Sequence, residues 1–153
     1  MKELDLTDLQ YEPEGQFLDR KRASIPPQRA AQYLSAFANG LGGRLILGVE
    51  DDGGITGFKF PGSVPVAEYL AAPGRFLREQ PTYTTTRIPC RNFRGETDEI
   101  LVFHVAPYRN GVVTLVDGSG YLRVGDATRK INLTLLAELK KRWDRRGDRV
   151  SGT

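Results

Sequence analysis

The sequence predicts one α+β domain, in which about three helices pack on a mixed, mostly antiparallel sheet. Two observations lead to this fold class. Short apolar or β-branched segments alternate with turns rich in glycine, asparagine and aspartate, and longer stretches carry apolar residues at helical spacing. A length of 153 residues fits one domain with a substantial core, and we find no repeat or interdomain linker.

The first helix expected with a clear buried face opens at residues 24–27, where a serine can cap the exposed amides and proline suits the first turn. Its apolar side chains recur at the spacing of one helix face at Ala30, Leu34, Phe37 and Ala38. Asn39 and Gly40 end this helix because both tolerate a left-handed backbone.

A buried strand and an acidic turn follow this helix. Residues 43–49 are nearly all apolar, which predicts a strand covered on both faces. Glu50, Asp51 and Asp52 then lie at the end of that strand, where loops usually carry function.

The remaining elements are expected from residue type and turn signals. Further strands are predicted at residues 14–23, 55–59, 82–88, 99–105, 111–116 and 120–124. Further helices are predicted at residues 66–72, where Pro73 and Gly74 interrupt the helix before a continuation through Arg78 that stays open, and at residues 133–146. The expected organisation is an N-terminal arm at residues 1–13, a domain at 14–146 and a flexible tail at 147–153.

Composition limits the class of protein. A hydrophobic content of 39% and a charged content of 27% are typical of a folded globular chain and exclude disorder. No apolar run approaches the ~20 residues that cross a bilayer, and the acidic N-terminus lacks the apolar segment of a signal peptide. Because Cys90 is the only cysteine, an intrachain disulfide and a cysteine-based zinc site are excluded. We therefore expect a cytoplasmic protein without a membrane partner.

The net charge of +3 is unevenly distributed. Residues 1–19 carry six acids and one base, which leaves 21 bases against 13 acids in the rest of the chain. The bases cluster at residues 20–22 and 140–149. A basic body favours a polyanionic partner, and the alternative that these side chains only solvate the surface stays open.

Four segments together resemble a known family, the Schlafen AlbA-type DNA-binding domain that is often found at the head of divergent AAA proteins. The segments are residues 14–21 (EGQFLDRK), 36–43 (AFANGLGG), 48–53 (GVEDDG) and 121–128 (YLRVGDAT). They occur in the family's order and span nearly the whole chain. The resemblance implies a Schlafen AlbA-like fold and nucleic-acid binding.

The resemblance also implies a catalytic possibility, because some relatives are similar to metal-dependent endoribonucleases that act on transfer and ribosomal RNA through three acidic residues. Carried onto this chain, the acids are Glu14, Asp19 and Asp51, with Asp52 as the rival of Asp51. Carboxylates suit Mg²⁺ or Mn²⁺, and no nucleotide or organic cofactor is expected. In a regular strand Glu14 and Asp19 point to opposite faces, so they converge only if Gly15 bends the chain.

Nucleic-acid contacts are expected from basic side chains in the first motif, the last motif and the C-terminal helix. They are Arg20, Lys21, Arg22, Arg123, Lys140, Lys141 and Arg145. The alternatives to a nuclease are a non-catalytic DNA- or RNA-binding module, a domain like those of transcription regulators, or a module that binds protein. Because nuclease relatives are similar to two-lobed horseshoes, a single copy of this domain is expected to form a homodimer.

Overall fold

The computed structural model of the chain describes residues 5–132, 134–139 and 141. The elements in chain order are α1 (Leu6–Tyr11), β1 (Leu18–Lys21), α2 (Pro27–Asn39), β2 (Gly43–Leu47), α3 (Val66–Phe76), β3 (Tyr83–Arg91), β4 (Thr97–Val105), β5 (Tyr121–Val124) and β6 (Ala127–Lys130). A four-stranded sheet has the order β1-β2-β4-β3, in which β1 and β2 are parallel and the other pairs antiparallel. A separate hairpin joins β5 and β6. The structure confirms the predicted α+β domain with a mixed sheet.

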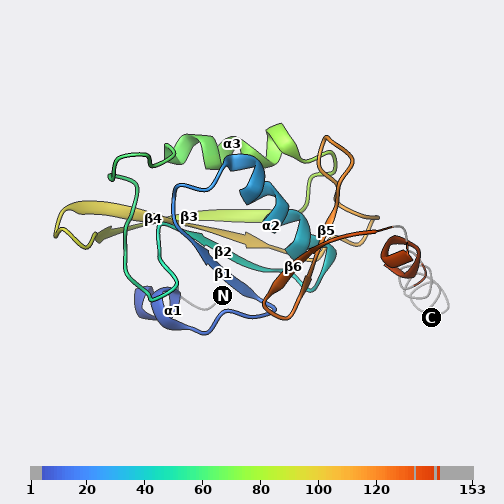
Figure 1. Cartoon of the computed structure of the whole chain (residues 1–153), viewed down its shortest axis with the longest axis horizontal. Helices are drawn as coiled ribbons and strands as arrows, with labels where there is room; N and C mark the ends of the chain where they lie inside the picture. Colours follow the sequence, from blue (N-terminus) through green and yellow to red (C-terminus); the bar gives the residue numbers. More distant parts are fainter. Residues whose placement is uncertain (1–4, 133, 140, 142–153) are drawn as a thin grey trace.

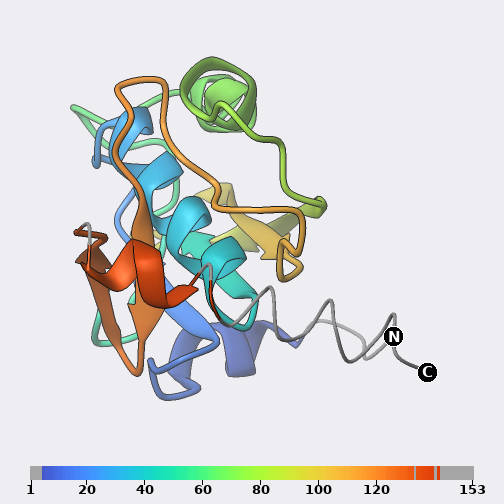
Figure 2. The same ribbon diagram turned by 90° about the vertical axis from the view of Figure 1, so that its right-hand side faces the viewer.

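The sheet separates two hydrophobic cores. Helices α2 and α3 lie over one face, and α1 covers part of the other (Figure 1). The larger core joins α2 and α3 to Leu45, Leu47 and Phe103, whereas the smaller one joins Leu9 of α1 to the opposite side of the same strands. Seen after a quarter turn, the β5–β6 hairpin runs beside α2 at the edge of the molecule (Figure 2).

The apolar part of strand β2 is covered on both faces of the sheet, as its sequence predicts. Leu45 and Leu47 belong to the larger core, and Ile46 between them belongs to the smaller one. Because side chains of a strand alternate between faces, a strand covered on both sides needs apolar residues at every position.

The prediction of a strand at residues 55–59 is wrong. Only Ile55 forms a bridge, to Val49, before the chain turns away from the sheet. The buried Asp98 carboxylate accepts a hydrogen bond from the Phe58 amide at 2.9 Å. At Gly57, with φ of 62°, a Cβ would collide with that carboxylate. The hydrogen bond to the Asp98 side chain of β4 thus takes the place of the backbone hydrogen bonds that a strand at residues 55–59 would make.

Two further predictions need correction. Helix α3 continues through Pro73 to Phe76, with Pro73 buried under its apolar face, so the proline does not interrupt it. The segment at 120–124 pairs with β6, and residues 111–116 form no strand but two isolated bridges, from Thr114 to Gly120 and from Leu115 to Leu77. The Thr114 amide instead donates to the Glu79 carboxylate at 2.6 Å, and Gly125, with φ of 59°, allows the tight β5–β6 turn.

Candidate functional site

A turn at the start of β1 brings the first motif together. The Gly15 amide donates to the Leu18 carbonyl at 3.2 Å, so the chain folds back before it enters the sheet. The bend expected at Gly15 is therefore present. The side chains of Asp19 and Lys21 lie on the face covered by α2, because their register partners in β2 are Leu45 and Leu47.

Asp19 is the buried centre of this site, with 2% of its surface exposed. Its Oδ2 accepts a hydrogen bond from Arg123 Nη1 at 2.6 Å, and its Oδ1 lies 3.2 Å from Lys21 Nζ. The Arg123 guanidinium also donates to the carbonyls of Gly15 and Leu18, at 3.0 and 3.1 Å, and stacks over the Phe37 ring. Arg123, which we expected to contact nucleic acid, thus has protein partners on every nitrogen and fastens β5 to the first motif.

Glu14 lies in the electrostatic field of the same carboxylate. Its pKa is raised from 4.5 to about 7, first by burial, then by the negative charge of Asp19 and a hydrogen bond with it, and least by the charge of Asp51. The Lys21 ammonium opposes this shift of the Glu14 pKa. The structure therefore brings Glu14, Asp19 and Asp51 into one neighbourhood and favours a proton on Glu14 near neutral pH.

The stability of the protein should depend on this proton. Because the folded chain holds it more tightly than the unfolded chain, the free energy of unfolding is expected to fall as the pH rises from about 4.5 to about 7. Glu14→Gln removes that dependence and makes the slope shallower, by on the order of 1 kcal/mol across the window. Urea denaturation at a series of pH values measures it, with the exposed Glu12→Gln as the control that keeps the slope. An unchanged slope in Glu14→Gln would contradict the assignment.

The acidic turn after β2 is docked against α1. Gln10 Nε2 donates to the Gly53 carbonyl at 3.0 Å, and a Cβ at Gly53 would collide with the Tyr11 ring. Asp52 accepts a hydrogen bond from the Gly54 amide at 2.8 Å and shapes the turn, whereas Asp51 is exposed and acts on Glu14. The charge of Asp51 is the smallest of the causes that raise the Glu14 pKa, so the preference for Asp51 over Asp52 stays a prediction.

These acids do not form a ready-made metal centre. Among the residues that the structure describes, no three Asp, Glu, His or Cys side chains are grouped closely enough to hold a metal ion. Both oxygens of Asp19 also face cationic side chains, Arg123 and Lys21, within 3.2 Å. Carboxylates are the right ligand type for Mg²⁺ or Mn²⁺, but in this arrangement Asp19 is neutralised by the protein itself.

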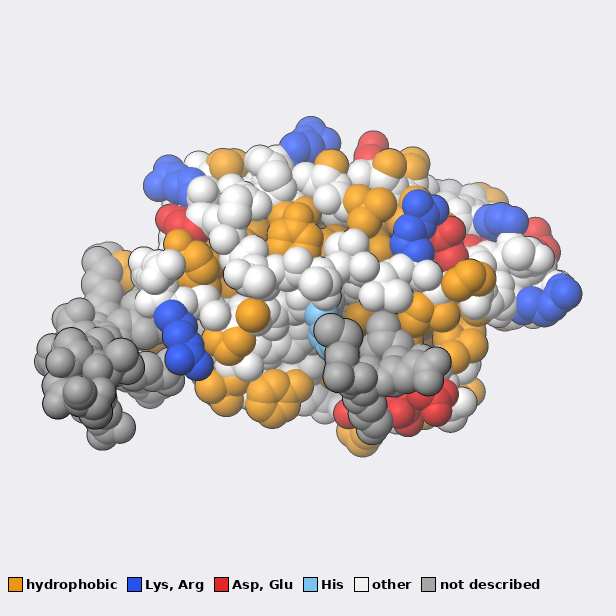
Figure 3. Space-filling model, turned by 180° about the vertical axis from the view of Figure 1, so that it is seen from behind, with side chains coloured by type: hydrophobic (Ala, Val, Ile, Leu, Met, Phe, Trp, Pro, Cys, Tyr) orange, Lys and Arg blue, Asp and Glu red, His pale blue; other side chains and the backbone are white. Residues whose placement is uncertain are grey.

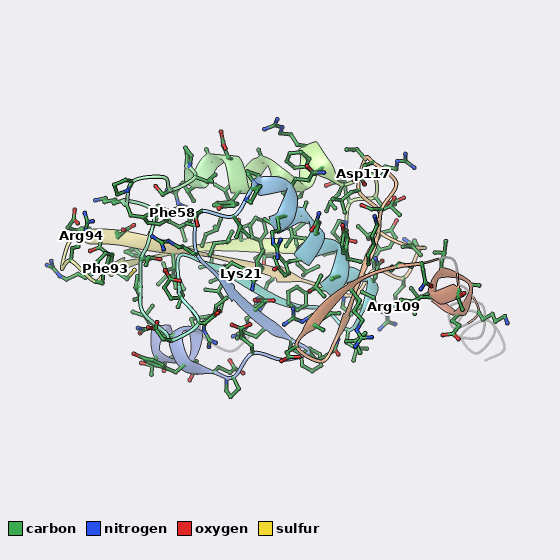
Figure 4. All side chains as sticks on the ribbon, viewed as in Figure 1. Lys21, Phe58, Phe93, Arg94, Arg109 and Asp117 are labelled. Atoms are coloured by element: carbon green, nitrogen blue, oxygen red, sulfur yellow. The ribbon has the colours of Figure 1, made fainter. Side chains whose placement is uncertain are left out.

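The three bases that follow Asp19 in the sequence have different surroundings. Arg20 is 3% exposed and donates to the carbonyls of Leu9 and Glu12, which fastens α1 to the sheet instead of facing solvent. Lys21 lies over the Tyr33 ring, 5.2 Å from its centre (Figure 4). Arg22 is half exposed, stacks 4.5 Å from the centre of the Phe60 ring and lies 3.6 Å from the Glu50 carboxylate.

The start of α2 adds a feature that sequence reasoning missed. The N-cap is Pro26 and makes no side-chain hydrogen bond, so the expected serine cap is wrong. Proline at this position cannot cap, and the first turn carries no acid. Arg29 is exposed one turn before Tyr33 and shares that ring with Lys21. The i, i+4 spacing of Arg29 and Tyr33 was the available signal.

The C-terminal cluster is described only in part. Lys140 and Arg145 lie outside the described residues. Lys141 is exposed, and residues 134–139 are helical, with Leu139 buried. No helix of the described ranges has the length and apolar character needed to span a membrane.

A hollow of the surface lies elsewhere, on the sheet face that α1 leaves open. It has a volume of about 530 Å³ and its lining includes Phe17, Leu41, Arg44, Tyr83 and His104. His104 reaches the surface there, and Lys and Arg side chains are scattered over this face without forming one patch (Figure 3). None of the predicted site residues lines this hollow.

Comparison with known proteins agrees with the four motifs. A family model described as Schlafen, AlbA_2 matches residues 14–132. The fold is similar to the crystal structure of the DIP2311 protein from Corynebacterium diphtheriae, with a TM-score of 0.54 and 21% sequence identity. That similarity covers 82% of this chain but 24% of the other, so this chain spans about a quarter of the matched protein. No curated protein sequence matches significantly. The family match includes the Gly15 turn, the Asp19–Arg123 pair and the acidic turn, and the chain belongs to the Schlafen AlbA_2 family.

Proposed function

We propose that this chain binds the phosphate backbone of nucleic acid through Lys21 at the end of β1, Arg22 directly after it and Arg29 in the first turn of α2, which we call the cationic face. The observation that carries the proposal is the open N-terminus of this 13-residue helix, which has neither a side-chain cap nor an acid in its first turn. The helix dipole attracts anions at such an end. The amides of Arg29 and Ala30 already donate to the Pro26 carbonyl, so the dipole and the cationic side chains, and not a row of free amides, would hold a phosphate. Membership of the Schlafen AlbA_2 family supports a nucleic-acid-binding role.

The surroundings of these cations suit contact with a backbone. Arg22 and Arg29 are exposed, and aromatic rings hold all three side chains in place, Phe60 under Arg22 and Tyr33 under the other two. Such stacking reduces the side-chain entropy lost on binding and leaves the charged groups accessible. Contacts of this kind neutralise phosphates without reading bases, so binding should depend strongly on salt.

A second candidate function is a metal-dependent endoribonuclease that acts on structured RNA such as transfer or ribosomal RNA. The specific observation in its favour is the neighbourhood of Glu14, Asp19 and Asp51, since three acids gathered beside a phosphate-binding face are unfavourable for simple binding. The candidate ion is Mg²⁺ or Mn²⁺. Asp19 is paired with Arg123 and Lys21, so in this arrangement its carboxylate is not free to hold the ion.

The proposed function predicts that the double variant Arg22→Ala/Arg29→Ala binds transfer RNA and DNA more weakly. Each lost phosphate contact lowers the slope of log affinity against log salt by about one, so the slope should fall by about two. Fluorescence anisotropy over a salt series measures this slope. The matched control is Arg94→Ala at the tip of the β3–β4 hairpin, because Arg94 is exposed and stacks on an aromatic ring, Phe93, in the same manner (Figure 4).

The outcomes separate the two candidates. Equal losses in the double variant and in Arg94→Ala would contradict the cationic face, and no binding by the wild type would contradict the function itself. Incubation with RNA and Mg²⁺ or Mn²⁺, against chelator, then tests cleavage. Cleavage that Asp51→Ala abolishes while binding is retained would establish the endoribonuclease, whereas binding without cleavage leaves the binding module.

A further inference from the structure

We propose that two copies of this chain form a two-fold homodimer in which β3 of one pairs antiparallel with β3 of the other, centred on Thr85. The joined sheets would make one continuous eight-stranded sheet. This inference rests on the free edge of the sheet and does not depend on the proposed nucleic-acid binding.

The two edges of the sheet differ. At the β1 edge, the Leu18 carbonyl accepts from the Gly15 amide and from Arg123 Nη2, so the start of that edge is already occupied by the protein's own groups. Strand β3 forms the other edge, and residues 84–87 are all exposed. An uncovered strand edge is a template for pairing with a further strand.

The register shows which backbone groups face outward. The Thr82 carbonyl accepts from the Ala106 amide and the Asn92 amide donates to the Glu96 carbonyl, so even-numbered positions of this strand face β4. Tyr83, Thr85 and Arg87 therefore direct their amides and carbonyls away from the sheet, because successive residues alternate. No partner for these groups exists among the residues that the structure describes.

Two prolines bracket this segment symmetrically. Pro81 and Pro89 lie four residues before and after Thr85. Both have odd numbers, like the residues whose backbone groups face away from the sheet, and neither has an N–H. A two-fold axis at Thr85 sets each Pro81 opposite Pro89 of the second copy, so the positions without donors face one another. Between the two prolines, the outward amides of Tyr83, Thr85 and Arg87 would each donate to a carbonyl of the second copy. This symmetry favours a second copy of the chain over an unrelated strand.

Side chains are compatible with the same register. Thr84 would lie opposite Thr86 of the second copy, and Tyr83 opposite Arg87, both of which are favourable cross-strand pairs. No like charges face each other. The Arg87 guanidinium donates two hydrogen bonds to the Glu99 carboxylate, at 2.7 and 3.0 Å. The Arg87 side chain is therefore already oriented before two copies associate.

A disulfide on the two-fold axis tests the register. In a Cys90→Ser background, Thr85→Cys places the two new thiols directly opposite, with Cα atoms about 5.5 Å apart, within the range of a disulfide. Oxidation should then give a covalent dimer. Thr86→Cys in the same background is the control, because its thiol would face Thr84 and not its own copy. Equal cross-linking of both variants, or none in either, would overturn the proposed register.

Sedimentation analysis of the full chain over a concentration series tests the dimer itself. The wild type should dimerise, and Thr85→Pro, which removes the central outward amide from both copies, should raise the dimer dissociation constant tenfold or more. Thr85→Ala keeps the amide and should dimerise like the wild type, and circular dichroism checks that both variants fold. A wild type that is monomeric at every concentration, or a Thr85→Pro variant with unchanged dimerisation, would overturn the proposal.

Discussion

Arg123→Ala is expected to lower the free energy of unfolding by about 3–5 kcal/mol, because removing one partner of a buried ion pair leaves the other charge uncompensated. The guanidinium is 2% exposed and contacts the Asp19 carboxylate, two carbonyls of the first motif and the Thr128 hydroxyl at 3.0 Å. Lys21 would remain beside Asp19, but on the other oxygen. Urea denaturation of the variant and the wild type measures the difference.

A control within the same hairpin isolates the ion pair. Arg129 is exposed on β6, opposite Leu122 of β5, so Arg129→Ala should change the free energy of unfolding by less than about 0.5 kcal/mol. Arg123→Lys keeps one charge but not the forked geometry, and should recover only part of the loss. If Arg123→Ala were as stable as the wild type, the hairpin would not be fastened through Asp19.

Asn39→Ala should produce the second large loss, about 3 kcal/mol. The buried side-chain amide donates to the carbonyls of Val113 and Tyr121, at 3.0 and 2.9 Å, and accepts from the Val113 amide at 2.7 Å. Alanine leaves the Val113 amide and the Tyr121 carbonyl buried without these bonds, at a cost of about 1–3 kcal/mol each. The Ser35 hydroxyl still donates to the Val113 carbonyl, which limits the loss.

Thermal and urea denaturation of Asn39→Ala measure this loss. Gln32→Ala on the same helix is the control, since Gln32 is only partly buried and alanine favours the helix, so its stability should stay close to that of the wild type. A loss in Asn39→Ala no greater than that in Gln32→Ala would show that α2 does not hold the C-terminal segments through this side chain.

Arg123 and Asp19 show why the motifs could be recognised in the sequence while the roles of their residues could not. Arg123 and Asp19 are 104 residues apart, and nothing in local spacing indicates that they pair. The same residue types that suggested phosphate contact and metal binding form a buried ion pair, because a neutralised pair is what an interior can hold. Arg20 also has a role other than the predicted contact with nucleic acid. Its guanidinium donates hydrogen bonds to carbonyls at the end of α1.

The failures in secondary structure have the same origin. The β-branched residues of β3 and the apolar residues of β2 predicted their strands because burial on a sheet selects those side chains. Residues 55–59 have similar residue types, yet the Phe58 amide donates to the Asp98 carboxylate and not to a neighbouring strand, as a β-ladder would require. A hydrogen bond from a distant strand cannot be foreseen from local pattern.

The sequence by itself determined the fold class, the helix from Pro27 to Asn39, the buried strand after it and the family, because these depend on periodicity and on motifs within short segments. Only the tertiary structure decided that Arg20 and Arg123 are buried among protein partners, that Arg22 and Arg29 are exposed, and that β3 is the free edge. Those properties depend on which distant groups share a buried space, where desolvation and pairing override residue type.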